Sequence, residues 1–298
     1  MARILPYGRT LRGMRETVTQ RHASALGSWE MVRAAPAPAL RGLVTRYCGY
    51  VEESPGPRQR IEVPSADVTL ILSLGPRIDV GYPQRGGAPR TLTCFVAPLH
   101  DTWAQTSFTG RQEGIEINLS PLALHMLLGL PLHEISNRVV DLADLMGREA
   151  DLLVEQLAGL ASWEARFALL DAALAARLRD AAGPAPSVVW AWRRLLASSG
   201  AVTVTDLAGE LGCSRRHLVA GFREHIGLPP KRVARILRFG RVLSLLEESG
   251  GRGLGDIALA CGYADQPHLN RDFRAFAGTT PGDWVARTLP DGAGTAAD

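Results

Sequence analysis

Two stretches near the carboxyl end of this chain resemble each other and decide its fold. The first reads DLAGELGCSRRHLVAGFREHIGLPP, from Asp206 to Pro230, and the second reads DIALACGYADQPHLNRDFRAFAGTTP, from Asp256 to Pro281. When one inserted residue is allowed, the identical pairs are Asp206 and Asp256, Ala208 and Ala258, Gly212 and Gly262, His217 and His268, Leu218 and Leu269, Phe222 and Phe273, Arg223 and Arg274, Gly227 and Gly278, and Pro230 and Pro281. This similarity over about 25 residues indicates an internal repeat.

Each copy begins with the pattern of a short helix that ends at a glycine. Asp206 and Asp256 are expected to cap these helices, because a carboxylate accepts hydrogen bonds from the free backbone N–H groups of a first turn. Gly212 and Gly262 follow at the point where the helix ends and the chain turns sharply. Left-handed backbone is common at that point, and glycine adopts it without steric cost.

A second helix follows the glycine in each copy. Ser214 and Asp265 are expected to cap these helices, and Gly227 and Gly278 to end them. The apolar residues at positions i and i+4 on the buried faces are Leu218 with Phe222, joined by His217 or Gly221, and Leu269 with Phe273. Helix, glycine turn and helix together make a helix-turn-helix unit, whose second helix enters the major groove of DNA.

The segment between the two units is expected to be one long helix. It reads PKRVARILRFGRVLSLLEE, from Pro230 to Glu248. Its apolar stripe consists of Val233, Ile236, Leu237, Val242, Leu245 and Leu246. Such a helix would join the units rigidly, and recognition helices on one face of DNA should lie about one helical turn apart, roughly 34 Å.

These motifs resemble the DNA-binding domain of the AraC/XylS family of transcription regulators, over about Ser187 to Arg287. The second unit carries the family pattern as Gly262-Tyr263, Asp265-Gln266, Leu269 with Phe273, Gly278-Thr279-Thr280-Pro281, and Trp284. The resemblance implies a sequence-specific, DNA-binding transcription regulator. It also implies an N-terminal sensor, a cupin-like β barrel followed by dimerising helices, although no motif there names an effector.

DNA-contacting residues are expected on the outward faces of the second helices, where a guanidinium can donate two hydrogen bonds to guanine. Those expected to read bases are Arg215, Arg216, Val219, Ala220, Gln266, Pro267, His268, Asn270 and Arg271. Those expected to bind phosphate are Arg223, Lys231, Arg232, Arg235, Arg274, Thr279 and Thr280. Phosphate binding or plain solvation is the alternative for Arg215 and Arg216. Ala220 departs from the base-reading arginine of the family, which leaves a thymine methyl contact at most.

The first part of the chain has the pattern of short strands. Runs of β-branched and aliphatic residues at Arg60–Val63, Val68–Leu74, Leu92–Val96 and Gly114–Leu119 alternate with turn signals at Ser54–Pro57, Gly75-Pro76 and Pro83–Pro89. This spacing predicts a sandwich or barrel. From Pro121 the period becomes helical, with an apolar stripe that includes Leu152, Leu157, Phe167, Leu170, Leu174 and Leu178. The stripe fits packing on the β domain, a dimer face, or both.

The predicted organisation is α+β, with an N-terminal cupin-like β domain, following helices, and an all-α C-terminal domain of two helix-turn-helix units joined by a long helix. The predicted boundaries are a mobile segment at 1–27, a β-rich sensor at 28–120, a helical dimerisation segment at 121–181, a linker at 182–187, the DNA-binding domain at 188–288, and a mobile tail at 289–298. Polar and aromatic residues that would line an effector pocket, or lie on ordinary surface, are Arg60, Asp67, Tyr82, His100, Trp103, Arg111 and Glu113.

Composition agrees with a DNA-binding protein and argues against other classes. The chain has 298 residues and a net charge of +3, but residues 185–288 hold about 14 basic against 9 acidic side chains. No secretory signal or membrane span is expected, so we expect a cytoplasmic protein. Double-stranded DNA and a homodimer partner are expected, with a small-molecule effector or a protein as the regulating partner and RNA polymerase as a further candidate.

An enzymatic role is the rival interpretation. A cupin-type hydrolase or dioxygenase fused to the DNA-binding domain would need several histidines and a glutamate in the barrel. The β region offers only His100, no His-x-His pair exists, and no G-x-S-x-G motif is present. The four cysteines are far apart and form no CxxC pair. We therefore expect no enzyme activity, no cofactor and no metal site.

Overall fold

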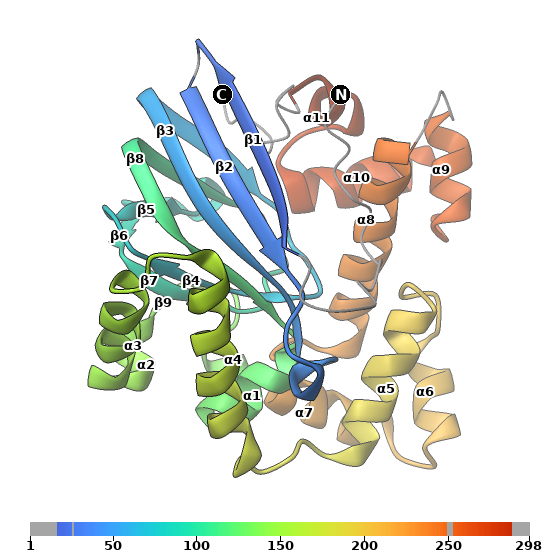
Figure 1. Ribbon diagram of the computed structural model, residues 1–298. Coiled ribbons are helices and arrows are strands. Elements are labelled where there is room, and N and C mark those ends of the chain that lie inside the picture. The colour runs from blue at the N-terminus through green and yellow to red at the C-terminus, as the bar shows by residue number, and fades with distance from the viewer. Residues whose placement is uncertain (1–16, 26, 249–252, 288–298) are drawn as a thin grey trace.

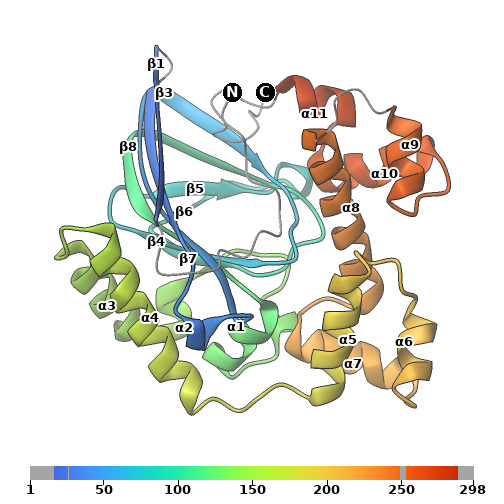
Figure 2. The ribbon, with the colours of Figure 1, turned by 45° about the vertical axis from the view of Figure 1, so that its right-hand side comes forward.

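The computed structural model describes residues 17–25, 27–248 and 253–287, and they divide into a β-rich half and a helical half (Figure 1). Within these residues, nine antiparallel strands form one sheet. Figure 2 shows that this sheet is strongly curled, with the helical domain beside it. The predicted order of a β domain, helices and an all-α domain is confirmed.

The sheet is built around two long strands. The order is β1 (Val18–Ser24), β2 (Gly27–Ala34), β3 (Val44–Glu62), β8 (Ala104–Leu119), β4 (Val68–Ser73), β7 (Cys94–Ala97) and β9 (Val140–Asp141). Off this path, β5 (Ile78–Gly81) pairs with β8 and with β6 (Arg90–Leu92). One end of β8 pairs with β4 and the other with β5. This long strand therefore connects the two parts of the curled sheet.

The turn predicted at Ser54–Pro57 is wrong. Strand β3 runs through these residues, and its register against β8 shifts between Ser54 and Arg58. A proline within a strand is tolerated at such a bulge, where its missing N–H breaks no ladder hydrogen bond. The proline-glycine signal was therefore real, but it marks an irregularity inside one long strand.

The outer face of the sheet packs against helices that follow it. These are α1 (Pro121–Leu128), α2 (Leu142–Met146), α3 (Arg148–Ala158) and α4 (Trp163–Arg179). Tyr47 of β3 stacks on Phe167 of α4 with ring centroids 5.5 Å apart, and its hydroxyl donates to the buried Asp171 at 2.8 Å. The stripe Phe167, Leu170, Leu174 and Leu178 is buried. This stripe therefore packs within the chain, while Leu152 of α3 stays 44% exposed.

The predicted boundaries need two corrections. Residues 18–24 form strand β1, so the predicted mobile segment 1–27 is wrong over that range, because alternation in a short edge strand was too weak a signal. Residues 1–16 and the predicted tail 289–298 lie outside the described residues. The predicted linker 182–187 ends early, because Pro186 already begins α5 (Pro186–Ala197) and proline is favoured in a first helical turn.

The C-terminal domain continues with α6 (Val204–Glu210), α7 (Arg215–His225), α8 (Pro230–Glu248), α9 (Leu254–Ala260), α10 (Gln266–Ala277) and α11 (Pro281–Arg287). Helix α8 has the predicted bounds, and it buries Val233, Ile236, Phe239, Val242 and Leu245. It packs against α5 and α7 on one side and against α9 and α10 on the other. No helix within the described ranges is long and apolar enough to cross a membrane.

Candidate nucleic-acid interface

The first helix-turn-helix unit consists of α6 and α7. Thr203, and not the predicted Asp206, is the N-cap of α6. Asp206 lies three residues further on, and the two side chains form a capping box in which each accepts from the other's backbone N–H. Ser214 caps α7 as predicted, since its hydroxyl accepts from His217 N at 3.2 Å.

The second unit consists of α9 and α10. Its first helix is capped at Gly253, so the prediction that Asp256 is the cap is also wrong; Asp256 lies in the first turn, where its charge complements the helix dipole. Asp265 caps α10 as predicted, and its carboxylate accepts from His268 N at 2.7 Å. The shared aspartates of the repeat therefore mark the first turn of each helix.

The turns between the helices are formed as the repeat predicts. Gly212 has φ +62° and Gly262 has φ +74°, the left-handed conformation that disfavours a side chain. The predicted apolar pairs Leu218 with Phe222 and Leu269 with Phe273 are buried. In α7 the third inward position belongs to Gly221, where a Cβ atom would lie 2.8 Å from Val188, whereas His217 is exposed.

The outward faces of α7 and α10 are open at their first turns. The expected base-reading residues that are exposed are Arg215, Arg216, Ala220, Gln266, Pro267 and Arg271; those that are half-buried are Val219, His268 and Asn270. His268 packs edge-on against the Tyr263 ring, with centroids 5.2 Å apart. The side-chain oxygen Oδ1 of Asn270 is buried with no hydrogen-bond partner among the described residues, so this end of the side-chain amide is turned inward.

The expected phosphate-binding residues separate into two groups. Arg223, Lys231 and Arg274 are exposed. Arg232, although half-exposed, is paired with Asp101 of the β domain at 3.2 Å. Thr279 is buried, and the Thr280 hydroxyl accepts from Asp283 N at 3.2 Å in the first turn of α11.

Of the basic side chains among the expected phosphate contacts, that of Arg235 is the least exposed. Its guanidinium donates to both carboxylate oxygens of Asp272 on α10, at 2.7 and 3.3 Å, and lies 5.1 Å from the centre of the Phe276 ring. The hydrogen bond from Arg235 to Asp272 raises the pKa of this arginine. The pair joins the connecting helix to the second recognition helix.

A comparison with protein families matches residues 207–287 to the family described as "Helix-turn-helix domain". This segment is an AraC-type helix-turn-helix domain. The match begins at Leu207, inside α6, and ends at Arg287, the last residue of α11, so it covers both units and the connecting helix. No curated protein sequence matches the chain.

Solved structures similar to this chain include ToxT from Vibrio cholerae, 11% identical, with 78% of this chain and 96% of that chain covered and a TM-score of 0.43. A transcriptional regulator with an AraC-type DNA-binding domain from Chromobacterium violaceum is 27% identical, covering 35% of this chain and 94% of that one, with a TM-score of 0.32. A probable AraC family transcriptional regulator from Rhodopseudomonas palustris is 24% identical, covering 36% and 100%, with a TM-score of 0.32.

The residues expected to line an effector pocket do not gather at one site, although two pairs among them are in contact, Arg111 with Glu113 and Tyr82 with His100. Arg60 pairs with Glu52 at 3.0 Å, and Asp67 accepts from Thr45 at 3.1 Å at the other end of β3. Glu113 pairs with Arg111 at 3.1 Å and with Arg166 at 2.9 Å, and Arg111 also pairs with Glu53 at 3.2 Å. Burial raises the pKa of Glu113, but hydrogen bonds from Arg166 and Arg111 outweigh it, and the net pKa is lowered.

Tyr82 and His100 do meet. The Tyr82 hydroxyl bonds to His100 Nε2, and His100 Nδ1 bonds to the carbonyl oxygen of Pro98. Burial lowers the pKa of His100 to about 4, so the ring is neutral at pH 7. A neutral ring with Nδ1 donating to the carbonyl must accept the tyrosine proton at Nε2. Trp103, on the same loop, packs instead on Gly278 of the AraC-type domain.

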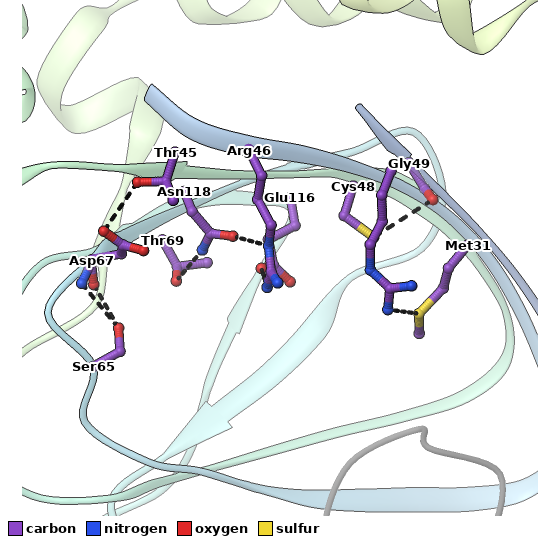
Figure 3. Close-up of polar contacts among 11 residues, drawn as sticks. Met31, Thr45, Arg46, Cys48, Gly49, Ser65, Asp67, Thr69, Glu116 and Asn118 are labelled. Atoms are coloured by element: carbon purple, nitrogen blue, oxygen red, sulfur yellow. Dashed lines mark hydrogen bonds and ion pairs between the residues drawn. The ribbon is translucent and has the colours of Figure 1, made fainter. Parts of the chain in front are cut away.

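A polar cluster that the sequence analysis missed lies on the concave face of the sheet, opposite α4 (Figure 3). Arg46 Nε donates to Asn118 Oδ1 at 2.6 Å, and Arg46 also pairs with Glu116 at 3.1 Å. Asn118 donates to Thr69 at 3.4 Å. Cys48 lies beside them, and burial raises the pKa of its thiol to about 12. The signal was available in the alternation of Glu116 and Asn118 with isoleucines, but the partner strand had not been predicted.

Three or more histidine, cysteine, aspartate or glutamate side chains do not gather in a metal-binding group anywhere in the described ranges. The four cysteines are unpaired thiols, two of them buried. Cys213 lies in the turn of the first unit, and Cys261 is the C-cap residue of α9, where both pack as small apolar groups.

Proposed function

We propose that this protein is a sequence-specific transcription regulator that binds duplex DNA through α7 and α10 and receives its signal through the β domain. The observation that carries the proposal is the pair of helix-turn-helix units whose recognition helices have exposed first turns. Arg215 and Arg216 open α7, and Gln266 opens α10. Residues in these turns reach base edges when such a helix enters the major groove.

Base reading is assigned to the outward residues of both helices, and most strongly to Arg216. Leu218 and Phe222 are buried and fix the inward face of α7, so Arg216 projects away from the domain. Arg215, Val219, Ala220, Gln266, Pro267, His268, Asn270 and Arg271 complete the base-reading set. Arg223, Lys231 and Arg274 bind phosphates. Thr279 and Thr280, between α10 and α11, would offer backbone N–H groups to a phosphate of the DNA.

The test begins with selection of duplexes from a random pool by the full chain. Selected and scrambled duplexes are then compared by gel shift over a range of salt concentrations. The selected duplex should bind at least ten-fold more tightly at physiological salt. Equal binding of the two duplexes would refute the proposed function.

Two arginine variants separate the proposed roles. Arg216→Ala should relax preference at one base pair, because a bidentate guanine contact is worth about 1–3 kcal/mol. Arg274→Ala should weaken all duplexes about equally. Arg179→Ala, at the exposed end of α4, is the control with the same change in charge and should leave binding unchanged. A uniform loss from Arg216→Ala would make Arg216 a phosphate contact.

We infer that the concave face of the sheet is where a small-molecule effector binds. Arg46, Asn118 and Thr69 place donors and acceptors side by side there, and 47% of the Arg46 side chain is exposed. Thermal-shift screening of the full chain with small polar metabolites tests this. Stabilisation by a compound should weaken in Thr69→Val and persist in Thr19→Val, a variant of exposed Thr19 on β1. Equal responses would place the compound elsewhere.

We also propose that the chain forms a homodimer through α3 and α4. Leu152 is 44% exposed on α3, and Ala168, Ala172 and Ala176 form an exposed small-residue row on α4, which allows close helix packing. Sedimentation at micromolar concentration should show a dimer that Leu152→Glu weakens. Leu196→Glu, at a residue of similar exposure on α5 (41%), is the control. A wild-type chain that sediments only as a monomer would refute the dimer.

A further inference from the structure

The helical segment that follows the β domain contacts the second helix of the first unit near its end. His225, the last residue of α7, packs edge-on against His125 of α1, with ring centroids 4.3 Å apart. The next turn is equally close, because a Cβ atom on Gly227 would meet the side chains of Ser136 and Leu132. The exposed first turn of α7 lies at the opposite end of the helix from this contact.

A second contact joins the β7–β8 loop, residues 98–103, to the second unit. The Asp101 carboxylate pairs with the Arg232 guanidinium at 3.2 Å, and their side chains are 19% and 49% exposed. Trp103 covers Gly278, the left-handed C-cap of α10, where a Cβ atom would lie 2.6 Å from the ring. One loop of the β domain therefore holds both the start of α8 and the end of α10.

This loop is fixed from its own domain. The Asn137 side chain accepts from Asp101 N at 2.8 Å, and Asn137 N donates to the carbonyl oxygen of Leu99 at 3.2 Å. Gln84 donates to the carbonyl oxygen of Trp103 at 2.7 Å. Asn137 directly follows Ser136 of the first contact. The two contacts are thus tied together, and Asp101 is presented to Arg232 in a fixed position.

Arg232 is a residue whose chemistry suits two alternative partners. It lies in the first turn of α8, beside the exposed Lys231. A guanidinium binds carboxylate and phosphate oxygens with the same charge-assisted geometry. While Asp101 occupies Arg232, binding of a phosphate by Arg232 must displace the carboxylate, and the displaced carboxylate then repels the DNA backbone.

We propose that the β7–β8 loop is an autoinhibitory contact, in which Asp101 occupies Arg232 in place of a DNA phosphate until the β domain moves away. This rests on the proposed DNA-binding function. The docked chain binds DNA with one phosphate contact fewer than the released chain. An effector that shifts residues 98–103 increases affinity for all duplexes and leaves base preference unchanged, because Arg232 contacts no base edge.

The number of phosphate contacts is measurable from salt dependence. Each neutralised phosphate adds about 0.9 to the slope of log affinity against log salt. Asp101→Asn keeps the shape of the side chain and the backbone N–H that Asn137 holds, but it removes the charge that pairs with Arg232. In the full chain, on a selected duplex, this variant should bind about 2- to 5-fold more tightly at physiological salt, with the slope steeper by about 0.9.

Further variants make the measurement specific. Arg232→Ala should change wild-type binding little, and in the Asp101→Asn background it should abolish both the gain in affinity and the steeper slope. Trp103→Ala, which removes the ring from Gly278, should shift affinity in the same direction as Asp101→Asn. Glu53→Gln changes the net charge equally and breaks an exposed ion pair of the β domain, with Arg111, so it should leave both quantities unchanged.

Each outcome decides the proposal. A gain from Glu53→Gln as large as that from Asp101→Asn, or a gain that survives Arg232→Ala, would overturn it in favour of a general charge effect. An unchanged slope in Asp101→Asn, while selected and scrambled duplexes are still distinguished, refutes the autoinhibitory contact alone. A chain that does not distinguish those duplexes refutes the proposed function instead.

Discussion

The ion pair between Arg235 and Asp272 should be a major stabilising contact between α8 and α10. Side-chain exposure is 24% for Arg235 and 9% for Asp272, and both carboxylate oxygens are engaged. Breaking a buried pair by removing one partner costs about 3–5 kcal/mol, because the other charge is left without compensation. Since Arg235 keeps partial contact with water, we expect Asp272→Ala to lower the free energy of unfolding by about 1.5–3 kcal/mol.

The assay is urea unfolding of the full chain, followed by tryptophan fluorescence, because Trp284 packs on Phe273 of the same helix. A double-mutant cycle with Arg235→Met and Asp272→Leu separates the pair from its surroundings. The double variant should recover most of the loss, since an apolar replacement of both partners leaves no buried charge. Glu210→Gln, which breaks the exposed pair with Arg194, should leave the urea midpoint unchanged.

The result that would refute this reasoning is an Asp272→Ala midpoint equal to that of the wild type, combined with a loss of DNA affinity in Arg235→Met. That combination would mean that Arg235 leaves Asp272 in solution and acts as the phosphate contact which the sequence alone predicts. A loss of stability with no change in the salt dependence of DNA binding would support the structural role.

Three further predictions concern the β domain. Burial holds the pKa of His100 near 4, below its ordinary 6.5, so the unfolded chain binds the proton more readily and the free energy of unfolding should fall by about 3 kcal/mol as pH drops from 6.5 to 4. The urea midpoint should change less with pH over this range in His100→Asn, and an equally steep fall in that variant would contradict the assignment. Gly49→Ala should lower the melting temperature at a cost of about 1–3 kcal/mol, because the new Cβ would lie 2.4 Å from the Trp163 ring; an unchanged melting temperature would show that the ring moves freely. Tyr47→Phe should cost about 1–2 kcal/mol in chemical unfolding, because it removes the 2.8 Å hydrogen bond to buried Asp171, and a neutral result would mean that Asp171 is satisfied without it.

The helix-turn-helix units could be predicted from the sequence because their determinants are local. Ser214 and Asp265 bond to backbone groups three residues away, and Gly212 turns the chain between adjacent helices. The caps of the first helices are Thr203 and Gly253, three residues before the predicted Asp206 and Asp256. In a capping box the acidic residue lies three positions after the cap, so the aspartate that the repeat shares was mistaken for the cap itself.

The β domain was predicted less completely because its strands depend on distant partners. Strand β3 pairs with β8 across more than forty intervening residues, from Glu62 to Ala104, and its bulge at Ser54 looks locally like a turn. The concave cluster was missed for the same reason. Glu116 and Asn118 alternate visibly in the sequence, but Arg46 faces them only through the register of β3 against β8.

The basic residues of α8 show most clearly why spacing alone cannot assign a DNA contact. Lys231, Arg232 and Arg235 fall within about one turn of a helix, and all three have the charge that a phosphate requires. Their surroundings separate them: Lys231 is exposed, Arg232 is paired with the other domain, and Arg235 is paired across to α10. Asp101 and Asp272 lie far from these residues in sequence. The role of each basic side chain therefore depends on its partner: Lys231 faces solvent, Arg232 pairs with Asp101 of the β domain, and Arg235 joins α8 to α10 through Asp272.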